Sequence, residues 1–231
     1  MQTPTSWKME YEPKTDTLEL RIYSTVESDS WWKESETSAK HFSDMLKEYE
    51  NAKEIKIYIN SLGGSVMEGI AIYNQLKRHK AHKTVYIDGF ACSIASVIAM
   101  AGDTVIMPKN TCMMIHNAWI VAMGNAKELR KAADDLDVIN SAAIQAYLDR
   151  AGDKLTREKL TEMLDAETYL TAEQCIEYGF ADKHSDDNAG ADPEPDGTTK
   201  NQAAEMLAKQ AAAEEMERRH AKCMAIINQF I

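Results

Sequence analysis

Three places in the sequence set small or polar residues directly after an apolar, strand-like run, and each could contribute to a catalytic site. The first is the stretch from Asn60 to Ser65, where Gly63 and Gly64 follow an alternating run of apolar and polar residues. Paired glycines permit positive φ angles and let a backbone N–H group approach a ligand closely. Taken alone, the same pattern is also typical of an ordinary tight turn.

The second place is Ser93, which follows Gly89 and opens a run of small apolar residues. A serine there is either a simple helix N-cap or a nucleophile whose neighbouring amides and helix dipole would favour an oxyanion. Ser96, one helical turn further on, is the next candidate for the nucleophile. The G-x-S-x-G motif of the α/β-hydrolases is absent, so that fold is not supported.

The third place is His116, which closes an apolar strand. A histidine there is often a hydrogen-bonded core residue, but no other histidine of the chain has such surroundings. No two histidines have the spacing of metal ligands, so a zinc hydrolase is not indicated. We therefore predict no metal and no cofactor. The five other histidines all lie among polar residues: His41, His79, His82, His184 and His220.

Acyl transfer by serine needs a nucleophile, a base within hydrogen-bond reach and donors for the oxyanion. The three places supply these residue types in the order glycines, serine, histidine. If they lie at the ends of neighbouring strands of one sheet, they can meet in one site.

The elements that must position them alternate between strand-like and helix-like patterns from about residue 16 to 184, which predicts an α/β fold. Strands are expected at 18–23, 55–59, 83–87, 104–107 and 112–115, and helices at 38–49, 67–79, 93–101, 127–151, 155–164 and 171–178. The segment before them, residues 1–15, is treated as an N-terminal extension.

After residue 184 the composition changes. Residues 185–200 are acidic and contain proline and glycine, which predicts a flexible, disordered linker. Residues 201–231 are rich in Ala, Glu, Lys and Met and predict a helical tail. That tail is either a solvated helix or a helix that docks on a partner or forms a coiled coil.

Composition excludes several classes of protein. The 231 residues are 44% hydrophobic and 27% charged, an ordinary globular balance, and carry a net charge of −11. Such an acidic chain is a poor candidate for binding nucleic acid or anionic membranes. No apolar run is long enough to span a bilayer and no secretory signal is evident, so a cytoplasmic protein is expected. The four cysteines are dispersed and predict reduced thiols.

Four motifs stand in order along the chain: Ile59–Gly64, Gly89–Ser93, Met114–His116 and Thr171–Asp182. Together they resemble the proteolytic subunit of the Clp protease, the ClpP family. The resemblance covers about residues 16–184. The tryptophan pair at 31–32 and the run 165–171 are most similar to the branch of this family found in tailed phages and prophages, whose members are thought to be head maturation proteases.

The resemblance implies a ClpP/crotonase-type spiral of ββα units. It implies Ser93 as nucleophile and His116 as general base, with the N–H groups of Gly64 and Ile94 forming the oxyanion hole. Glu167 stands where the family usually has its third, aspartate member. Asp165, two residues earlier, is the alternative.

The resemblance further implies a homo-oligomer of stacked rings joined through the long helix at 127–151, and protein substrates. For the phage branch these would be capsid or scaffold proteins, cleaved in the bacterial cytoplasm or the procapsid. The peptidase would act either unaided or with an AAA+ unfoldase. The N-terminal segment does not clearly resemble the axial loops of the Clp subunit, and no P-loop is present.

Two other functions remain open on the sequence alone. One is a crotonase-like acyl-CoA enzyme on the same fold, which would use the glycine amides with carboxylates and would not need Ser93. The other is a catalytically inactive capsid-assembly scaffold that binds through its helical tail.

Overall fold

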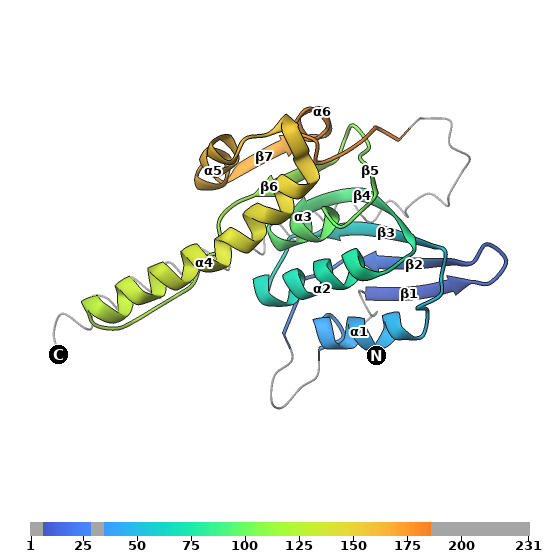
Figure 1. Ribbon diagram of the computed structural model, residues 1–231, viewed down its shortest axis with the longest axis horizontal. Coiled ribbons are helices and arrows are strands. Elements are labelled where there is room, and N and C mark those ends of the chain that lie inside the picture. The colour runs from blue at the N-terminus through green and yellow to red at the C-terminus, as the bar shows by residue number, and fades with distance from the viewer. Residues whose placement is uncertain (1–6, 29–34, 186–231) are drawn as a thin grey trace. The chain divides into compact units, whose positions relative to one another are not determined.

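A seven-stranded sheet organises the part of the chain that the structure describes, residues 7–28 and 35–185 of a computed structural model (Figure 1). These residues belong to a compact unit spanning residues 1–187. The predicted helical tail and nearly all of the predicted linker lie outside the described residues.

The strand order is β1-β2-β3-β4-β6-β7, with β5 paired to β4. The central strands are parallel, and the outer strands β1 and β7 are antiparallel to their neighbours. The long strand β4 pairs with β5 through residues 84–86 and with β6 through residues 90–92. The strands are β1 (Trp7–Glu12), β2 (Thr17–Ile22), β3 (Glu54–Ser61), β4 (His82–Cys92), β5 (Thr104–Ile106), β6 (Cys112–Ile115) and β7 (Thr168–Thr171).

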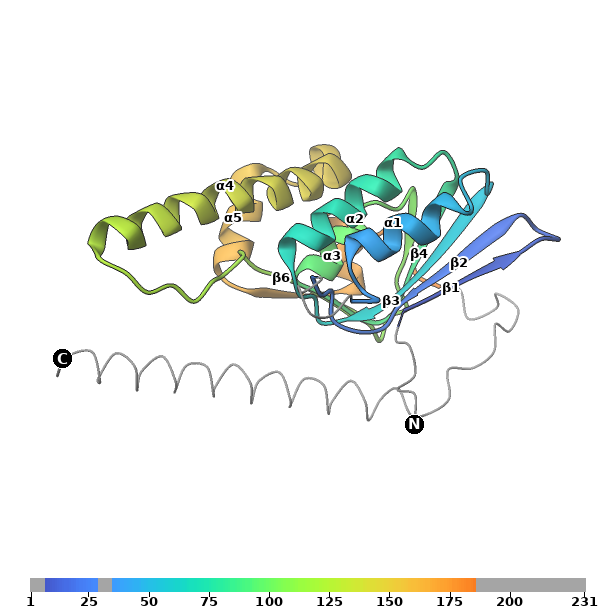
Figure 2. The same ribbon diagram turned by 90° about the horizontal axis from the view of Figure 1, so that it is seen from below.

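The core lies between this sheet and the helices α1 (Ala39–Lys47), α2 (Val66–Arg78) and α3 (Ile94–Ala99), which cover one face of the sheet (Figure 2). Strand β3 alternates strictly, with its three isoleucines fully buried. Helix α3 is buried along its whole length, as its small apolar sequence predicts. A buried helix directly after β4 leaves little freedom to the residue between them, Ser93.

Helix α4 (Ala126–Ala151) begins at a capping box formed by Asn125 and Glu128. Its N-terminal half projects from the rest of the unit (Figure 1), and only residues near its C-terminal end, including Tyr147, are buried. A short 3-10 helix (Gly152–Lys154), α5 (Arg157–Asp165), β7 and α6 (Ala172–Glu177) follow. No helix in the described part of the chain has both the length and the apolar content to cross a membrane.

The predicted α/β class is confirmed, and each expected strand and helix of the body is present with small shifts at its ends. Two strands were missed. Strand β7 lies mostly between the helices expected at 155–164 and 171–178, where no element was predicted, and β1 lies inside the segment predicted as an extension over residues 1–15. The predicted strand at 83–87 continues to Cys92, so Ser93 follows a strand directly.

Candidate active site

Parallel pairing of β4 with β6 brings Ser93 and His116 together. In this pairing Cys92 lies opposite Met114, so the residues that follow the two strands meet at the same edge of the sheet. The Ser93 N–H donates to the Met114 carbonyl at 2.8 Å. The Ser93 hydroxyl and Nε2 of His116 are 2.7 Å apart, within hydrogen-bond distance. Two residues predicted as nucleophile and base thus contact each other directly.

The backbone of Ser93 has φ 53° and ψ −130°, in a region that residues other than glycine rarely adopt. Holding a serine there costs about 1–3 kcal/mol, which the surrounding structure must offset. Ser93 occupies the N-cap position of α3, yet its side chain makes no capping hydrogen bond. The N-cap interpretation of this side chain is therefore wrong, because the hydroxyl faces His116 instead.

The glycine turn packs directly against Ser93. Gly63 has φ 101° and Gly64 has φ 142°. A Cβ built on Gly63 would lie 2.7 Å from the Ser93 Cβ and 3.2 Å from the Ile94 nitrogen. Only glycine allows this approach, so the turn has a role beyond reversing the chain.

Hydrogen bonds on its outer side hold the same turn. The Val26 N–H donates to the Gly63 carbonyl, and the Ser65 N–H donates to the Val26 carbonyl, both at 2.8 Å. The buried hydroxyl of Ser61 donates to the Ser24 carbonyl at 2.6 Å and accepts the Gly63 N–H at 3.2 Å. The sequence reasoning missed Val26 and Ser61, because their roles depend on contacts between distant segments.

The two predicted oxyanion donors flank this contact. Within the described residues, neither the Gly64 N–H nor the Ile94 N–H donates to another group. Backbone N–H groups are obligatory donors that normally find an acceptor. Two unused donors next to a serine that contacts a histidine are therefore suited to receive a negatively charged oxygen.

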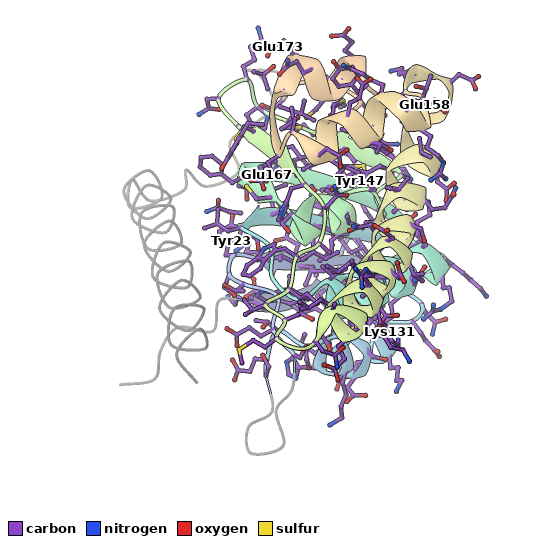
Figure 3. The ribbon with its side chains drawn as sticks, turned by 90° about the vertical axis from the view of Figure 1, so that its left-hand side faces the viewer. Tyr23, Lys131, Tyr147, Glu158, Glu167 and Glu173 are labelled. Carbon is purple, nitrogen blue, oxygen red and sulfur yellow. The ribbon has the colours of Figure 1, made fainter. Side chains whose placement is uncertain are left out.

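The two candidate carboxylates have different surroundings. Strand β7 is antiparallel to β6, and their pairing ends with Ile115 opposite Thr168, directly beside His116 and Glu167 in the chain. Glu167 is exposed, has φ 49° and lies between α5 and β7 (Figure 3). Asp165 instead accepts a hydrogen bond from the Asn117 side chain at 2.7 Å. Sequence reasoning had not included Asn117.

The groups behind Ser93 do not compete with it as nucleophiles. Ser96 is buried and its hydroxyl is bonded to the Ser93 carbonyl and to Tyr147. Burial, with a smaller contribution from Cys112, raises the pKa of Cys92 to about 12, so this thiol stays protonated. Cys92, Cys112 and Cys175 are all free thiols, as predicted, and Cys223 lies outside the described residues.

Within residues 7–28 and 35–185, no group of three histidine, cysteine or acidic side chains is arranged to hold a metal ion. The chemistry that the site supports is acyl transfer by a serine with a histidine base, which defines a serine hydrolase built on an α/β sheet.

Comparison with known proteins agrees with this class. The family model described as Clp protease matches residues 17–187, and the chain belongs to this family. It is therefore a serine peptidase of the ClpP type, a hydrolase.

Individual relatives show the same similarity, and each is named as an ATP-dependent Clp protease proteolytic subunit. The relative from Ligilactobacillus salivarius is 32% identical over 140 residues, which cover 59% of this chain and 70% of the relative. The relative from Oltmannsiellopsis viridis is 33% identical over 142 residues, covering 60% and 71%. The relative from Deinococcus radiodurans is 30% identical over 142 residues, covering 60% and 68%.

Proposed function

We propose that this chain is a serine endopeptidase in which Ser93 attacks the scissile carbonyl and His116 acts as the base. The observation that carries the proposal is the 2.7 Å contact between Nε2 of His116 and the Ser93 hydroxyl. His116 accepts the hydroxyl proton as the Ser93 oxygen bonds to the substrate carbonyl, and then donates that proton to the leaving amine. A water molecule repeats the sequence to release the acyl group from Ser93.

The N–H groups of Gly64 and Ile94 are proposed to bind the oxyanion of the tetrahedral intermediate. Support comes from their lack of other acceptors in the described structure and from the packing of the Gly63–Gly64 turn against Ser93. Removing one such donor typically costs about 10²–10³ in kcat. The crotonase alternative would use the same donors but gives no reason for the contact between Ser93 and His116.

Glu167 is proposed as the third member of the site. Support comes from the end of the β6–β7 pairing, where His116 directly follows Ile115 and Glu167 directly precedes Thr168, whereas Asp165 accepts a hydrogen bond from Asn117. A carboxylate in that position orients the imidazole and stabilises its charged form after proton transfer.

The assembly is proposed to be a homo-oligomer of stacked rings that act on protein substrates. Its support is membership of the Clp protease family and the projecting half of α4, which exposes apolar side chains such as Leu129 and Val138. The finer ClpP/crotonase spiral of ββα units rests on the same membership. Light scattering of the purified protein tests the ring.

The natural substrates are proposed to be capsid or scaffold proteins of a tailed phage, cleaved in the bacterial cytoplasm or the procapsid. The support is the sequence of residues 165–171, which resembles the phage and prophage branch. Co-expression with capsid and scaffold proteins of a tailed phage tests it. Cleavage that disappears with Ser93→Ala is expected, and intact substrates beside active enzyme would contradict the proposal.

The decisive test of the activity is labelling with a fluorophosphonate serine probe followed by peptide mapping. The label should lie on Ser93, and peptide hydrolysis should fall about 10⁶-fold in both Ser93→Ala and His116→Ala, because nucleophile and base act as a unit. Ser141→Ala is the matched control, since that serine is exposed on α4 and its hydroxyl donates to the Val138 carbonyl. A label elsewhere would contradict the proposal. A thermal shift with coenzyme A, without labelling by the probe, would favour the crotonase alternative. The absence of both the shift and the label would favour the inactive scaffold.

A further inference from the structure

A buried chain of hydrogen bonds joins helix α4 to the peptide group that follows Ser93. The Ser96 hydroxyl lies 2.5 Å from the Ser93 carbonyl oxygen and 2.5 Å from the Tyr147 hydroxyl. Ser96 is 0% exposed and Tyr147 is 1% exposed, so water does not substitute for any of these partners. Tyr147 lies near the C-terminal end of α4, which contacts α3 (Figure 3).

The donors and acceptors of this chain have only one consistent arrangement. A carbonyl oxygen can only accept, so Ser96 must donate its single hydroxyl proton to the Ser93 carbonyl. The Ser96 oxygen then accepts, and Tyr147 must be the donor. Burial raises the pKa of the Tyr147 phenol, which therefore keeps the proton that it donates.

The carbonyl at the end of this chain belongs to the residue with the unfavourable backbone. Ser93 has φ 53°, and its N–H is held by the Met114 carbonyl at 2.8 Å. On the other side its carbonyl accepts two hydrogen bonds, from the Ser96 N–H at 3.0 Å and from the Ser96 hydroxyl. A strained φ persists only when its surroundings determine it from several directions.

We propose that Ser96 and Tyr147 are positioning residues that hold the Ser93 backbone at its positive φ, so that the Ser93 hydroxyl meets His116. The inference rests on the proposed function, since it assigns these residues to the nucleophile of that site. The Tyr147 ring is itself fixed by a tilted contact with Phe180, with 5.3 Å between ring centroids. Packing against Phe180 thus orients the Tyr147 hydroxyl. That hydroxyl fixes the Ser96 side chain, which in turn holds the Ser93 carbonyl.

Tyr147→Phe is the most direct test, because it removes the hydroxyl and keeps the ring and its packing. We expect kcat for a peptide substrate to fall about 10-fold, the effect of losing one buried hydrogen bond, with KM within about twofold of the wild type. The rate of fluorophosphonate labelling should fall by a similar factor, since it reports the reactivity of Ser93 without peptide binding. A purely structural role would lower the melting temperature but leave both rates of the folded enzyme unchanged.

Tyr178→Phe is the matched control. Its ring also contacts Phe180, at 6.5 Å between centroids, and its hydroxyl makes no hydrogen bond with a described residue. This variant should keep the labelling rate of the wild type. All rates are compared below the lowest melting temperature of the set, so that every variant is folded.

Ser96→Ala and the double variant test whether the two residues act in series. Ser96→Ala should slow labelling at least as much as Tyr147→Phe, and adding Tyr147→Phe to it should change the rate less than twofold, because the connection is already broken. If the double variant instead slows labelling by the product of the two single reductions, the residues act separately and the proposal is wrong. If Tyr147→Phe does not fold, the labelling rate of Ser96→Ala alone decides.

The outcomes separate this inference from the proposed function. If the wild type is labelled at Ser93 and Tyr147→Phe reacts at the same rate, the positioning role is wrong and the proposed function stands. If the wild type is not labelled at Ser93, the proposed function fails and the positioning role fails with it.

Discussion

Replacing Gly63 by alanine should damage both stability and activity. The added Cβ would lie 2.7 Å from the Ser93 Cβ and 2.8 Å from the Cys92 carbonyl oxygen, closer than real Cβ atoms approach. Both neighbours belong to the junction between β4 and α3, which is buried and cannot move aside easily. Gly63 also has φ 101°, which an alanine adopts only with strain.

A matched control separates the two causes of the lost stability, backbone strain and steric overlap. Gly152 has φ 58° and open space where a Cβ would be, so Gly152→Ala carries backbone strain without overlap. That strain costs about 1–3 kcal/mol. Overpacking at Gly63 adds about 1–3 kcal/mol. For a chain of this size each kcal/mol lowers the melting temperature by about 2–4 °C, so Gly63→Ala should melt clearly below Gly152→Ala.

Chemical denaturation and probe labelling together check this reasoning. Gly63→Ala should react with a fluorophosphonate about 10²-fold more slowly, the usual cost of disturbing an oxyanion donor, because its Cβ displaces Ser93 and Ile94. Gly152→Ala should react at the rate of the wild type. Equal stabilities for the two variants, or undisturbed labelling in Gly63→Ala, would show that the close contact between the glycine turn and Ser93 is not as described.

Three further predictions concern other parts of the molecule. Glu167→Gln should lower kcat by about 10⁴ while Asp165→Asn lowers it only a few fold, and peptide hydrolysis assays would reverse the assignment if Asp165→Asn were the worse variant. Burial alone would raise the pKa of Asp103, but hydrogen bonds and charge from Lys83 outweigh it and hold that pKa below its usual value. A lowered carboxyl pKa stabilises the fold fully above the ordinary aspartate pKa of about 4. Asp103→Ala should therefore lower the free energy of unfolding by about 1 kcal/mol at pH 7, a figure that allows for the partial exposure of the carboxylate. The deficit should shrink as the pH falls below about 4, and a deficit independent of pH in urea titrations would exclude this ion pair as its cause. A chain ending at residue 187 should keep the melting temperature and peptide turnover of the full chain. A loss of either would show that the peptidase domain needs residues 188–231.

Sequence reasoning identified Ser93 and His116 as candidates because each follows an apolar run with a clear strand pattern. Glycines after such runs, as at Gly63 and Gly89, helped to indicate where the strands end. It did not distinguish a capping serine from a nucleophile, since both occupy the same position before a helix. That choice depends on which group the hydroxyl contacts, and the contact with His116 comes from pairing between strands whose paired residues are 22 positions apart in the chain.

The third residue stayed open for a similar reason. Glu167 and Asp165 are two positions apart, and the proposed choice between them rests on where the β6–β7 pairing ends and on the contact between Asp165 and Asn117. Strand β7 has four residues and was not predicted, so its register was not accessible. Ser96 and Tyr147 are 51 residues apart, and no local pattern connects a small helix residue with a tyrosine on another helix.

Strand β7 also has a consequence for how the enzyme is made. The ribosome releases Ser93 and His116 well before residues 168–171, which complete the sheet beside them. At about 5–20 residues per second, the 51 residues between His116 and Glu167 take about 3–10 seconds to synthesise. Through that interval the nascent chain contains Ser93 and His116 without the strand that completes the sheet beside them. Peptide hydrolysis is therefore expected only after residues 168–171 have been synthesised and have paired with β6.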